Sequence, residues 1–176
     1  MRNLIWVLGA AGMLVGAPAL AEVSASGPPG FTVTETAHIA APPDQVYAVL
    51  IAPARWWSPD HTFSKNAANL RLEARAGGCW CEDLPSGGSV EFLHVVYADP
   101  GKMLRLRGAL GPLQTLPADG VITWTLVANT DGTDLKVTYA IFGDPTAGLE
   151  TLADPVDKVL GEQVESLKKT VEGGQP

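Results

Sequence analysis

Residues 154–171, DPVDKVLGEQVESLKKTV, predict one long amphipathic α-helix near the end of the chain. Pro155 suits the first helical position, so Asp154 is the expected N-cap, and the glycines at 173 and 174 are typical of a helix end. Apolar side chains recur at spacings of three and four and share one face: Val156, Val159, Leu160, Val164, Leu167 and Val171. Burying them would contribute on the order of 10 kcal/mol. The rest of the chain must therefore supply a surface that covers this face.

The preceding part of the chain predicts an antiparallel sheet that can cover the helix. Residues 31–40 alternate between apolar and polar side chains, interrupted only by Glu35, and predict the first strand. Two short helices with prolines at their ends are expected next, one after residue 42 and one at 53–59. Turn signals separate six further strands, which are expected at 68–75, 78–84, 89–98, 102–110, 120–129 and 134–142. Short connections favour antiparallel pairing, so we predict a seven-stranded sheet in an α+β fold.

The composition and the N-terminal residues predict one exported domain. A hydrophobic fraction of 46% and a charged fraction of 18% are enough for one full core, which we place at 31–172. Residues 1–21 read as a secretory signal peptide, in which Arg2 precedes an apolar run and cleavage is expected after Ala21. The run is shorter than the roughly 20 residues of a membrane-spanning helix. We therefore expect a periplasmic or secreted protein without stable membrane insertion after cleavage.

The segments on either side of the domain carry no predicted function. Residues 22–30, EVSASGPPG, are small, polar or Pro/Gly-rich and predict a flexible lead-in, and 173–176 form a short tail. The net charge is −7, and it becomes −8 when the cleaved segment removes Arg2. An acidic surface disfavours nucleic acid and anionic membranes as partners.

Four stretches carry a resemblance to a known superfamily: APPDQVY at 41–47, RWW at 55–57, the glycine pair at 77–78, and ADPGKML at 98–104. With the order of the predicted elements, they resemble the START-related SRPBCC superfamily, and in particular its bacterial polyketide-cyclase and chaperone-ATPase-activator branch. The resemblance implies a helix-grip fold, in which the curved sheet wraps around the long C-terminal helix. It also implies a deep apolar cavity between sheet and helix, which members use for lipids, sterols, polyketides or plant hormones.

Cys79 and Cys81 lie two positions apart on a predicted strand and leave three interpretations open. They can be unpaired structural thiols. They can form a strained disulfide, because about 6.6 Å between the α-carbons of an extended strand is close to the limit of about 6.8 Å, and export favours oxidation. They can also belong to a metal or reactive site, for which His94 or His61 would have to supply further ligands, although no recognised zinc spacing is present.

His94 and Arg105 are candidates for catalysis, and each has a surface alternative. His94 lies in an apolar strand, so an inward imidazole could orient a ligand or act as a general base, whereas an outward one would be solvated. Arg105 shares one side of its strand with Arg107, which favours the solvated face. An inward Arg105 would instead select an anionic head group.

Residues 58–64 superficially contain the residue types of a catalytic triad: Asp60 and His61, with Ser58 or Ser64 as the serine. Nearby positions in one loop rarely give the geometry of a triad, and no G-x-S-x-G motif is present. We therefore expect no serine-hydrolase site here.

The expected cavity has predicted walls and a predicted mouth. Of the adjacent Trp56 and Trp57, we expect one to enter the core and the other to line the space beside it. The full set of candidate ligand-binding residues is Trp56, Trp57, Trp80, His94, Leu110, Leu113, Trp124, Tyr139 and Phe142. The apolar connection 108–114 suits the mouth of a cavity, and 143–153 would form the facing rim.

Three hypotheses about function follow. The first is an exported binding protein or carrier for an apolar small molecule, without a cofactor. The second is a cyclase- or dehydratase-type enzyme, in which His94, Arg105 or a cavity tyrosine moves protons; no acid/base pair is visible in the sequence. The third is a protein-interaction module, which the signal peptide disfavours because the related chaperone and its ATP are cytoplasmic.

Overall fold

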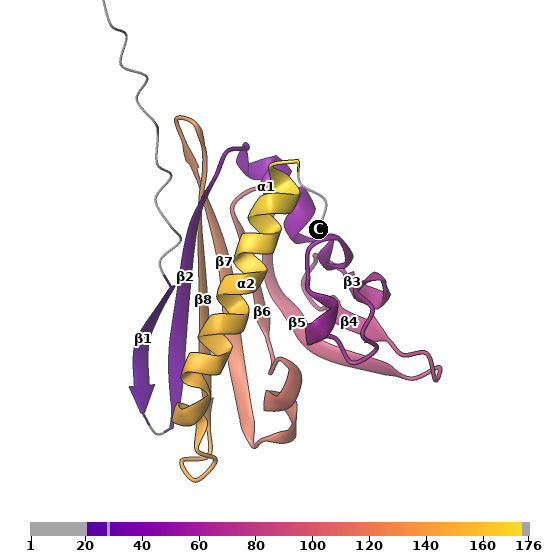
Figure 1. Cartoon of the computed structure of the whole chain (residues 1–176), viewed down its shortest axis with the longest axis vertical. Coiled ribbons are helices and arrows are strands. Elements are labelled where there is room, and N and C mark those ends of the chain that lie inside the picture. Colours follow the sequence, from indigo (N-terminus) through magenta and orange to yellow (C-terminus); the bar gives the residue numbers. More distant parts are fainter. Residues whose placement is uncertain (1–20, 28, 174–176) are drawn as a thin grey trace, which may run out of the picture.

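A computed structural model describes residues 21–27 and 29–173, and in it one curved antiparallel sheet wraps around one long helix (Figure 1). The sheet has eight strands in the order β1-β2-β8-β7-β6-β5-β4-β3. The strands are β1 Ala21–Gly27, β2 Gly30–Ile39, β3 Leu70–Leu72, β4 Cys79–Asp83, β5 Ser89–Asp99, β6 Met103–Arg107, β7 Ala118–Asn129 and β8 Gly132–Gly143. The α-helices are α1 Pro43–Leu50 and α2 Ala153–Val171, and the 3-10 helices are η1 Pro53–Arg55, η2 Pro59–His61, η3 Ala67–Asn69, η4 Gly111–Thr115 and η5 Leu149–Leu152.

The arrangement is the α+β helix-grip fold that the sequence predicts. All seven predicted strands are present, and α2 lies in the curve of the sheet, packed chiefly against β2 (Figure 1). The turns between β4 and β5, β5 and β6, and β7 and β8 fall at the predicted turn signals. Short connections thus give antiparallel neighbours throughout this part of the sheet.

The expectation of a flexible lead-in at 22–30 is wrong for most of that segment, because it forms the eighth strand, β1. The backbone of β1 pairs antiparallel with β2, with Val23 opposite Val33 and Ser26 opposite Phe31. Without β1, one edge of β2 would present unpaired N–H and C=O groups. Pairing of this kind uses the backbone alone, so small side chains do not prevent it.

Helix α2 buries the predicted face but begins differently from the prediction. The N-cap position is Leu152, which makes no side-chain cap, and Asp154 lies in the first turn. The reason is that η5 runs directly into α2, so the chain is already helical before Asp154. Leu160, Val164, Leu167 and Val171 are buried, whereas the more N-terminal Val156 and Val159 are only partly buried. This difference marks the place where a cavity opens beside the helix.

Four tryptophans fill the interior of the sheet beside the C-terminal half of α2. Trp56 packs edge-on against Trp124 and Trp57 against Trp80, with ring centroids 5.7 and 4.9 Å apart. The indole N–H of Trp56 donates to the backbone oxygen of Leu50 at 3.2 Å, so its polar atom is satisfied inside the core. We call this group the tryptophan cluster.

Two hydrogen bonds attach the tryptophan-bearing segment to α2. The backbone N–H of Ser58 donates to Gln163 Oε1 at 2.8 Å, and Ser166 Oγ donates to the backbone oxygen of Trp56 at 2.6 Å. Gln163 is 1% exposed, so its amide is held in a dry environment. The tryptophan cluster therefore occupies one half of the space under the helix and leaves the other half for a cavity.

Cys79 and Cys81 are joined by a disulfide, which selects one of the three interpretations left open by the sequence. Their α-carbons are 5.5 Å apart, closer than in a regular strand, because the pairing of β4 with β5 is irregular between Trp80 and Cys81. Neither unpaired thiols nor a metal site at these cysteines describes this arrangement. Trp80, between them, points into the tryptophan cluster.

Candidate functional site: an apolar pocket beside the long helix

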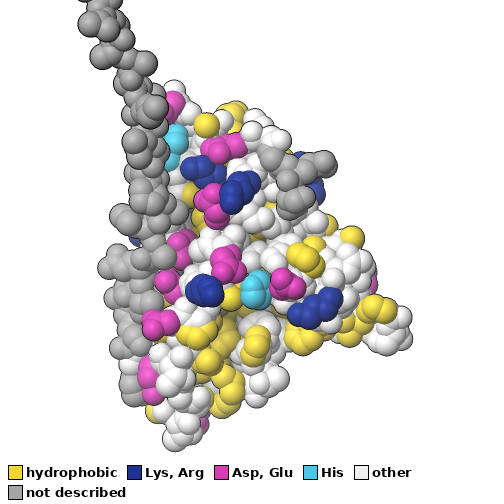
Figure 2. Space-filling view, in the orientation of Figure 1, with side chains coloured by type: hydrophobic (Ala, Val, Ile, Leu, Met, Phe, Trp, Pro, Cys, Tyr) yellow, Lys and Arg dark blue, Asp and Glu magenta, His cyan; other side chains and the backbone are white. Residues whose placement is uncertain are grey.

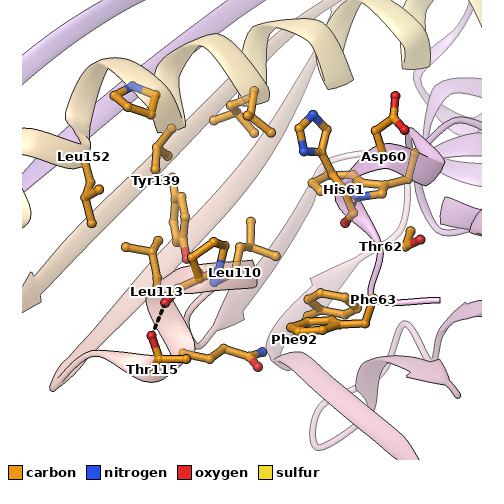
Figure 3. Close-up of a pocket in the computed structure, with 18 residues that line it drawn as sticks. Asp60, His61, Thr62, Phe63, Phe92, Leu110, Leu113, Thr115, Tyr139 and Leu152 are labelled. Carbon is orange, nitrogen blue, oxygen red and sulfur yellow. Dashed lines mark hydrogen bonds between the residues drawn. The ribbon is translucent and has the colours of Figure 1, made fainter. Parts of the chain in front are cut away.

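A pocket of about 620 Å³ lies beside the N-terminal half of α2 (Figure 3). Two connecting segments form much of its wall, 60–63 around η2 and 110–115 around η4. Trp57, Phe92 and Tyr139 contribute further side chains. The volume lies within the range of about 300 to 1,000 Å³ that is usual for small-molecule sites.

Most of the pocket wall is apolar. Aliphatic groups come from α2 and from the two facing connections: Leu110, Leu113, Leu152, Val156, Val159 and Leu160. Phe63 and Phe92 add an aromatic pair with ring centroids 5.7 Å apart, and Phe63 is 54% exposed. Figure 2 shows hydrophobic side chains gathered in the lower part of the face that carries α2. A partly exposed aromatic ring at the edge of an apolar pocket is suited to contact a ligand that enters from solvent.

Tyr139 fixes one wall of the pocket, and its hydroxyl is already hydrogen-bonded as both donor and acceptor within the protein. Its hydroxyl donates to the backbone oxygen of Gly108 at 3.1 Å and accepts from the backbone N–H of Leu110 at 3.0 Å. Burial raises the pKa of the Tyr139 phenol well above its ordinary value. The side chain therefore anchors the connection before η4 and is a poor proton donor or acceptor at neutral pH.

Glu82 fixes the opposite wall from outside the pocket. Its carboxylate is fully buried and accepts the backbone N–H groups of Phe63 at 2.9 Å and Ser64 at 2.5 Å. Charge-assisted bonds to consecutive backbone amides hold an extended segment in one conformation. The position of the pocket-lining Phe63 thus depends on a residue of β4.

His61 lines the pocket, and the carboxylate of Glu162 on α2 lies near its imidazole ring. His61 Nε2 is 3.8 Å from Glu162 Oε2, and the His61 side chain is 33% exposed. The backbone is held on both sides, because His61 N–H donates to Ser58 O at 3.1 Å and Trp57 Nε1 donates to His61 O at 3.1 Å. In Figure 3, His61 and Asp60 lie at one end of the pocket and Leu152 at the other.

Four of the candidate ligand-binding residues named from the sequence line the pocket: Trp57, Leu110, Leu113 and Tyr139. The expectation for the adjacent tryptophans holds, because Trp56 is 1% exposed in the core whereas Trp57 lines the pocket. The predicted mouth connection contributes Leu110 to Gln114, and the predicted facing rim contributes Leu152.

Trp56, Trp80 and Trp124 do not line the pocket, contrary to expectation. They are almost fully buried in the tryptophan cluster, one layer behind Trp57. The rings of Trp56 and Trp57, which follow η1, meet those of Trp80 on β4 and Trp124 on β7. The four rings therefore fill the space that an open cavity would need.

His94 lies on the outer face of the sheet and not in the pocket. Its side chain is 46% exposed and its Nδ1 is 3.4 Å from Glu91 Oε1. The register between β4 and β5 has an extra residue at Phe92, so Phe92 and Leu93 are both buried and the alternation is interrupted. Of the two placements that the sequence leaves open, the structure shows the solvated one, so the candidate role of His94 as a base or ligand-orienting group in the pocket is wrong.

Arg105 and Phe142 also lie outside the pocket. Arg105 Nε donates to Thr123 Oγ1 at 3.0 Å, and its guanidinium lies over the ring of Tyr97, 5.9 Å from the centroid, so it is committed to the outer face. Phe142 is 45% exposed, because Ile141 is its inward-facing neighbour in β8. The solvated placement that the sequence favours for Arg105 is confirmed, and its alternative role in selecting an anion does not apply. The wall role predicted for Phe142 is wrong.

Several pocket residues were missed as ligand contacts. Val156, Val159 and Leu160 were assigned to the buried helix face, and periodicity alone cannot show that a cavity separates them from the sheet. Phe63 had a usable signal, since it is one large apolar residue within the polar stretch 61–66. Glu82, which holds Phe63 in position from outside the pocket, had no such signal. A buried acid in a strand cannot be told from a surface acid in the sequence.

Two further features of the described residues bear on the site. Within 21–27 and 29–173, no three His, Cys, Asp or Glu side chains come together in a way that could hold a metal ion. In the same part of the chain, every helix is too short or too polar to cross a membrane.

Solved structures with the same fold come from several bacteria. Protein CV1439 from Chromobacterium violaceum is 23% identical over 80% of this chain and 96% of its own, with a TM-score of 0.58. CalU16 from Micromonospora echinospora is 18% identical over 90% and 85%, with a TM-score of 0.56. DynU16, a protein in the dynemicin biosynthetic locus, is 20% identical over 82% of this chain and 48% of its own, with a TM-score of 0.57. No curated protein matches the chain.

The sequence itself matches a family over nearly the whole described domain. Residues 30–172 match the family described as polyketide cyclase / dehydrase and lipid transport. This match confirms the resemblance to the SRPBCC superfamily that the stretches 41–47 and 98–104 indicate. The activities named in the family description act on apolar molecules, in agreement with the apolar pocket. The chain therefore belongs to the polyketide cyclase / dehydrase and lipid transport family.

Proposed function

We propose that this protein is an exported carrier that holds one apolar small molecule in the pocket beside α2. The observation that carries the proposal is the pocket itself, which combines about 620 Å³ of space with a wall made mainly of aliphatic and aromatic side chains. Lipid transport is among the roles in the family description. A pocket of this kind also favours a ligand-binding role over an interaction module, which would have a filled core.

Export is supported by the sequence of residues 1–21 and by the disulfide. The N-terminal run has the composition of a secretory signal, with Arg2 before an apolar stretch and small residues before Ala21. Disulfides persist in oxidising compartments, so the Cys79–Cys81 bond is in keeping with a periplasmic or secreted location.

Mass spectrometry of an organic extract tests the carrier function. The protein is purified from its native compartment beside a Val159→Trp variant, which fills the pocket, and a Val127→Trp variant, which adds the same ring at an outer position that is 57% exposed. We expect one enriched apolar species in the wild type and in Val127→Trp, and its loss in Val159→Trp. An empty extract from folded wild-type protein would overturn the carrier function.

A cyclase- or dehydratase-type enzyme is the second candidate, and one observation favours it. His61 lines the pocket with the Glu162 carboxylate 3.8 Å away, and a histidine next to a carboxylate can move protons. This pair replaces His94, Arg105 and the cavity tyrosine, none of which is available for that role. If the extracted species is converted to a product by the wild type but not by His61→Gln, the protein is an enzyme and not a carrier.

A further inference from the structure

The polar side chains of the pocket differ in whether the protein itself uses them. The Tyr139 hydroxyl is bonded on both sides, as described above. Thr62 Oγ1 donates to Pro59 O at 2.8 Å and accepts from Asn66 N–H at 3.0 Å, and Thr115 Oγ1 donates to Pro112 O at 2.8 Å. Gln114 Nε2 donates to Glu91 O at 2.8 Å. These four side chains mainly hold the wall in place.

His61 is different, because its backbone is fixed while its ring remains available. Within 21–27 and 29–173, neither ring nitrogen of His61 has a hydrogen-bond partner within 3.5 Å, and the nearest carboxylate oxygen, on Glu162, is 3.8 Å from Nε2. A neutral imidazole has one donor nitrogen and one acceptor nitrogen. The ring can therefore bond to either a hydroxyl or a carbonyl group of a molecule in the pocket.

The charges at this end of the pocket are unfavourable for an anion. The Glu162 carboxylate lies 3.8 Å from His61 Nε2, and Asp60 also lines the pocket. No lysine or arginine is among the described residues that line it. Lys65 is nearby, but its ammonium group donates to the backbone oxygen of Asp60 at 2.8 Å.

We propose that the ligand is an uncharged apolar molecule with a hydroxyl or carbonyl group, that His61 binds this group, and that carboxylates and phosphates are excluded. The inference rests on the proposed binding function of the pocket and names the chemical class of its ligand. The Glu162 carboxylate, 3.8 Å from Nε2 of the ring, repels an anionic head group. The aliphatic and aromatic wall then holds the rest of the molecule, with Leu152 at the far end.

Three probes with the same apolar chain test this selectivity by titration calorimetry at pH 7.5: 1-decanol, methyl decanoate and decanoate. The first two are uncharged and present a hydroxyl or an ester carbonyl, whereas the third is an anion. We expect the two uncharged probes to bind at least tenfold more tightly than decanoate. In His61→Phe, which keeps an aromatic ring but has no ring nitrogen, both should lose roughly tenfold in affinity, the order expected for one hydrogen bond in a partly dry site.

Two controls separate the possible outcomes. His94→Phe removes a histidine from the outer face and should leave all three affinities unchanged. Decanoate binding as tightly as 1-decanol, or unchanged 1-decanol affinity in His61→Phe, would overturn the role of His61 while leaving the carrier function in place. No binding of any of the three probes to folded wild-type protein would overturn the carrier function and this inference together.

Discussion

Glu35 of β2 lies directly against Gly161 of α2, and a Cβ at position 161 would be 3.1 Å from Glu35 Oε1. Glu35 is 1% exposed, and its Oε1 and Asp157 Oδ1 are buried without a hydrogen-bond partner among the described residues. Glu35, which interrupts the alternation of apolar and polar residues in β2, thus has its carboxyl group enclosed between the sheet and the helix. Gly161 leaves the room that this group needs.

The first prediction concerns the pH dependence of stability. Burial, and then the charge of Asp157, raise the pKa of Glu35 from 4.5 to about 7. A raised folded-state pKa contributes stability that is fully present below about 4.5 and is lost as the pH rises through about 7. We expect Glu35→Gln to be more stable than the wild type at pH 8 by roughly 1 to 2 kcal/mol, with little difference at pH 4.5. Urea unfolding at both pH values measures this, and parallel pH profiles would contradict it.

The second prediction concerns the contact between Gly161 and Glu35. An alanine in place of glycine inside a helix normally stabilises by about 1 kcal/mol. Here the added methyl group would crowd Glu35 Oε1, so we expect Gly161→Ala to destabilise the wild type and to stabilise the Glu35→Ala background. A double-mutant cycle by urea unfolding should give a coupling of roughly 1 kcal/mol or more. Additive effects would show that the two residues do not constrain each other.

The third prediction concerns the disulfide. The bond closes a very short loop, so the chain-entropy account gives it only about 1 to 2 kcal/mol of stability. We expect the Cys79→Ser/Cys81→Ser variant to lose about that amount in urea unfolding. Wild-type protein unfolded in the presence of a reductant is the control and should match the double variant. A loss beyond about 4 kcal/mol would mean that the bond supports more than the local strand.

The fourth prediction concerns Glu82. Removing its negative charge in Glu82→Gln leaves one amide oxygen to accept two backbone N–H groups, so the 60–64 segment should loosen. By hydrogen exchange, we expect the Phe63 and Ser64 amides to exchange at least tenfold faster than in the wild type. Glu91→Gln, at an exposed acid on the neighbouring strand, should leave both rates unchanged. Equal rates in all three proteins would remove Glu82 from its positioning role.

The fold could be predicted largely from the sequence, because its determinants are local or periodic. The apolar spacing along α2 identified the buried face that Leu160, Val164 and Leu167 form. The turn signals identified the strand order from β3 to β8. The strand β1 was missed because its stability comes from backbone pairing with β2, which small polar side chains do not reveal.

The pocket could be predicted only in part, since its shape depends on register and on the filling of space. One extra residue at Phe92 reverses the direction of His94, and no turn or composition signal marks that residue. The number of indole rings that meet under α2 decides where the cavity ends, and this is a property of the packed structure. His61 was considered only for metal binding and for a triad, because its nearness to α2 is visible only in three dimensions.

The tryptophan cluster divides α2 into a C-terminal half that is packed in the core and an N-terminal half that lines the pocket. Its C-terminal half is held by the indole rings and by the hydrogen bonds of Gln163 and Ser166, independently of any ligand. Its N-terminal half contributes Val156 and Val159 to the pocket. Substitutions in the N-terminal half can therefore reshape the pocket for a new molecule while the C-terminal half maintains the fold. This separation makes the domain a tolerant starting point for redesigned binding.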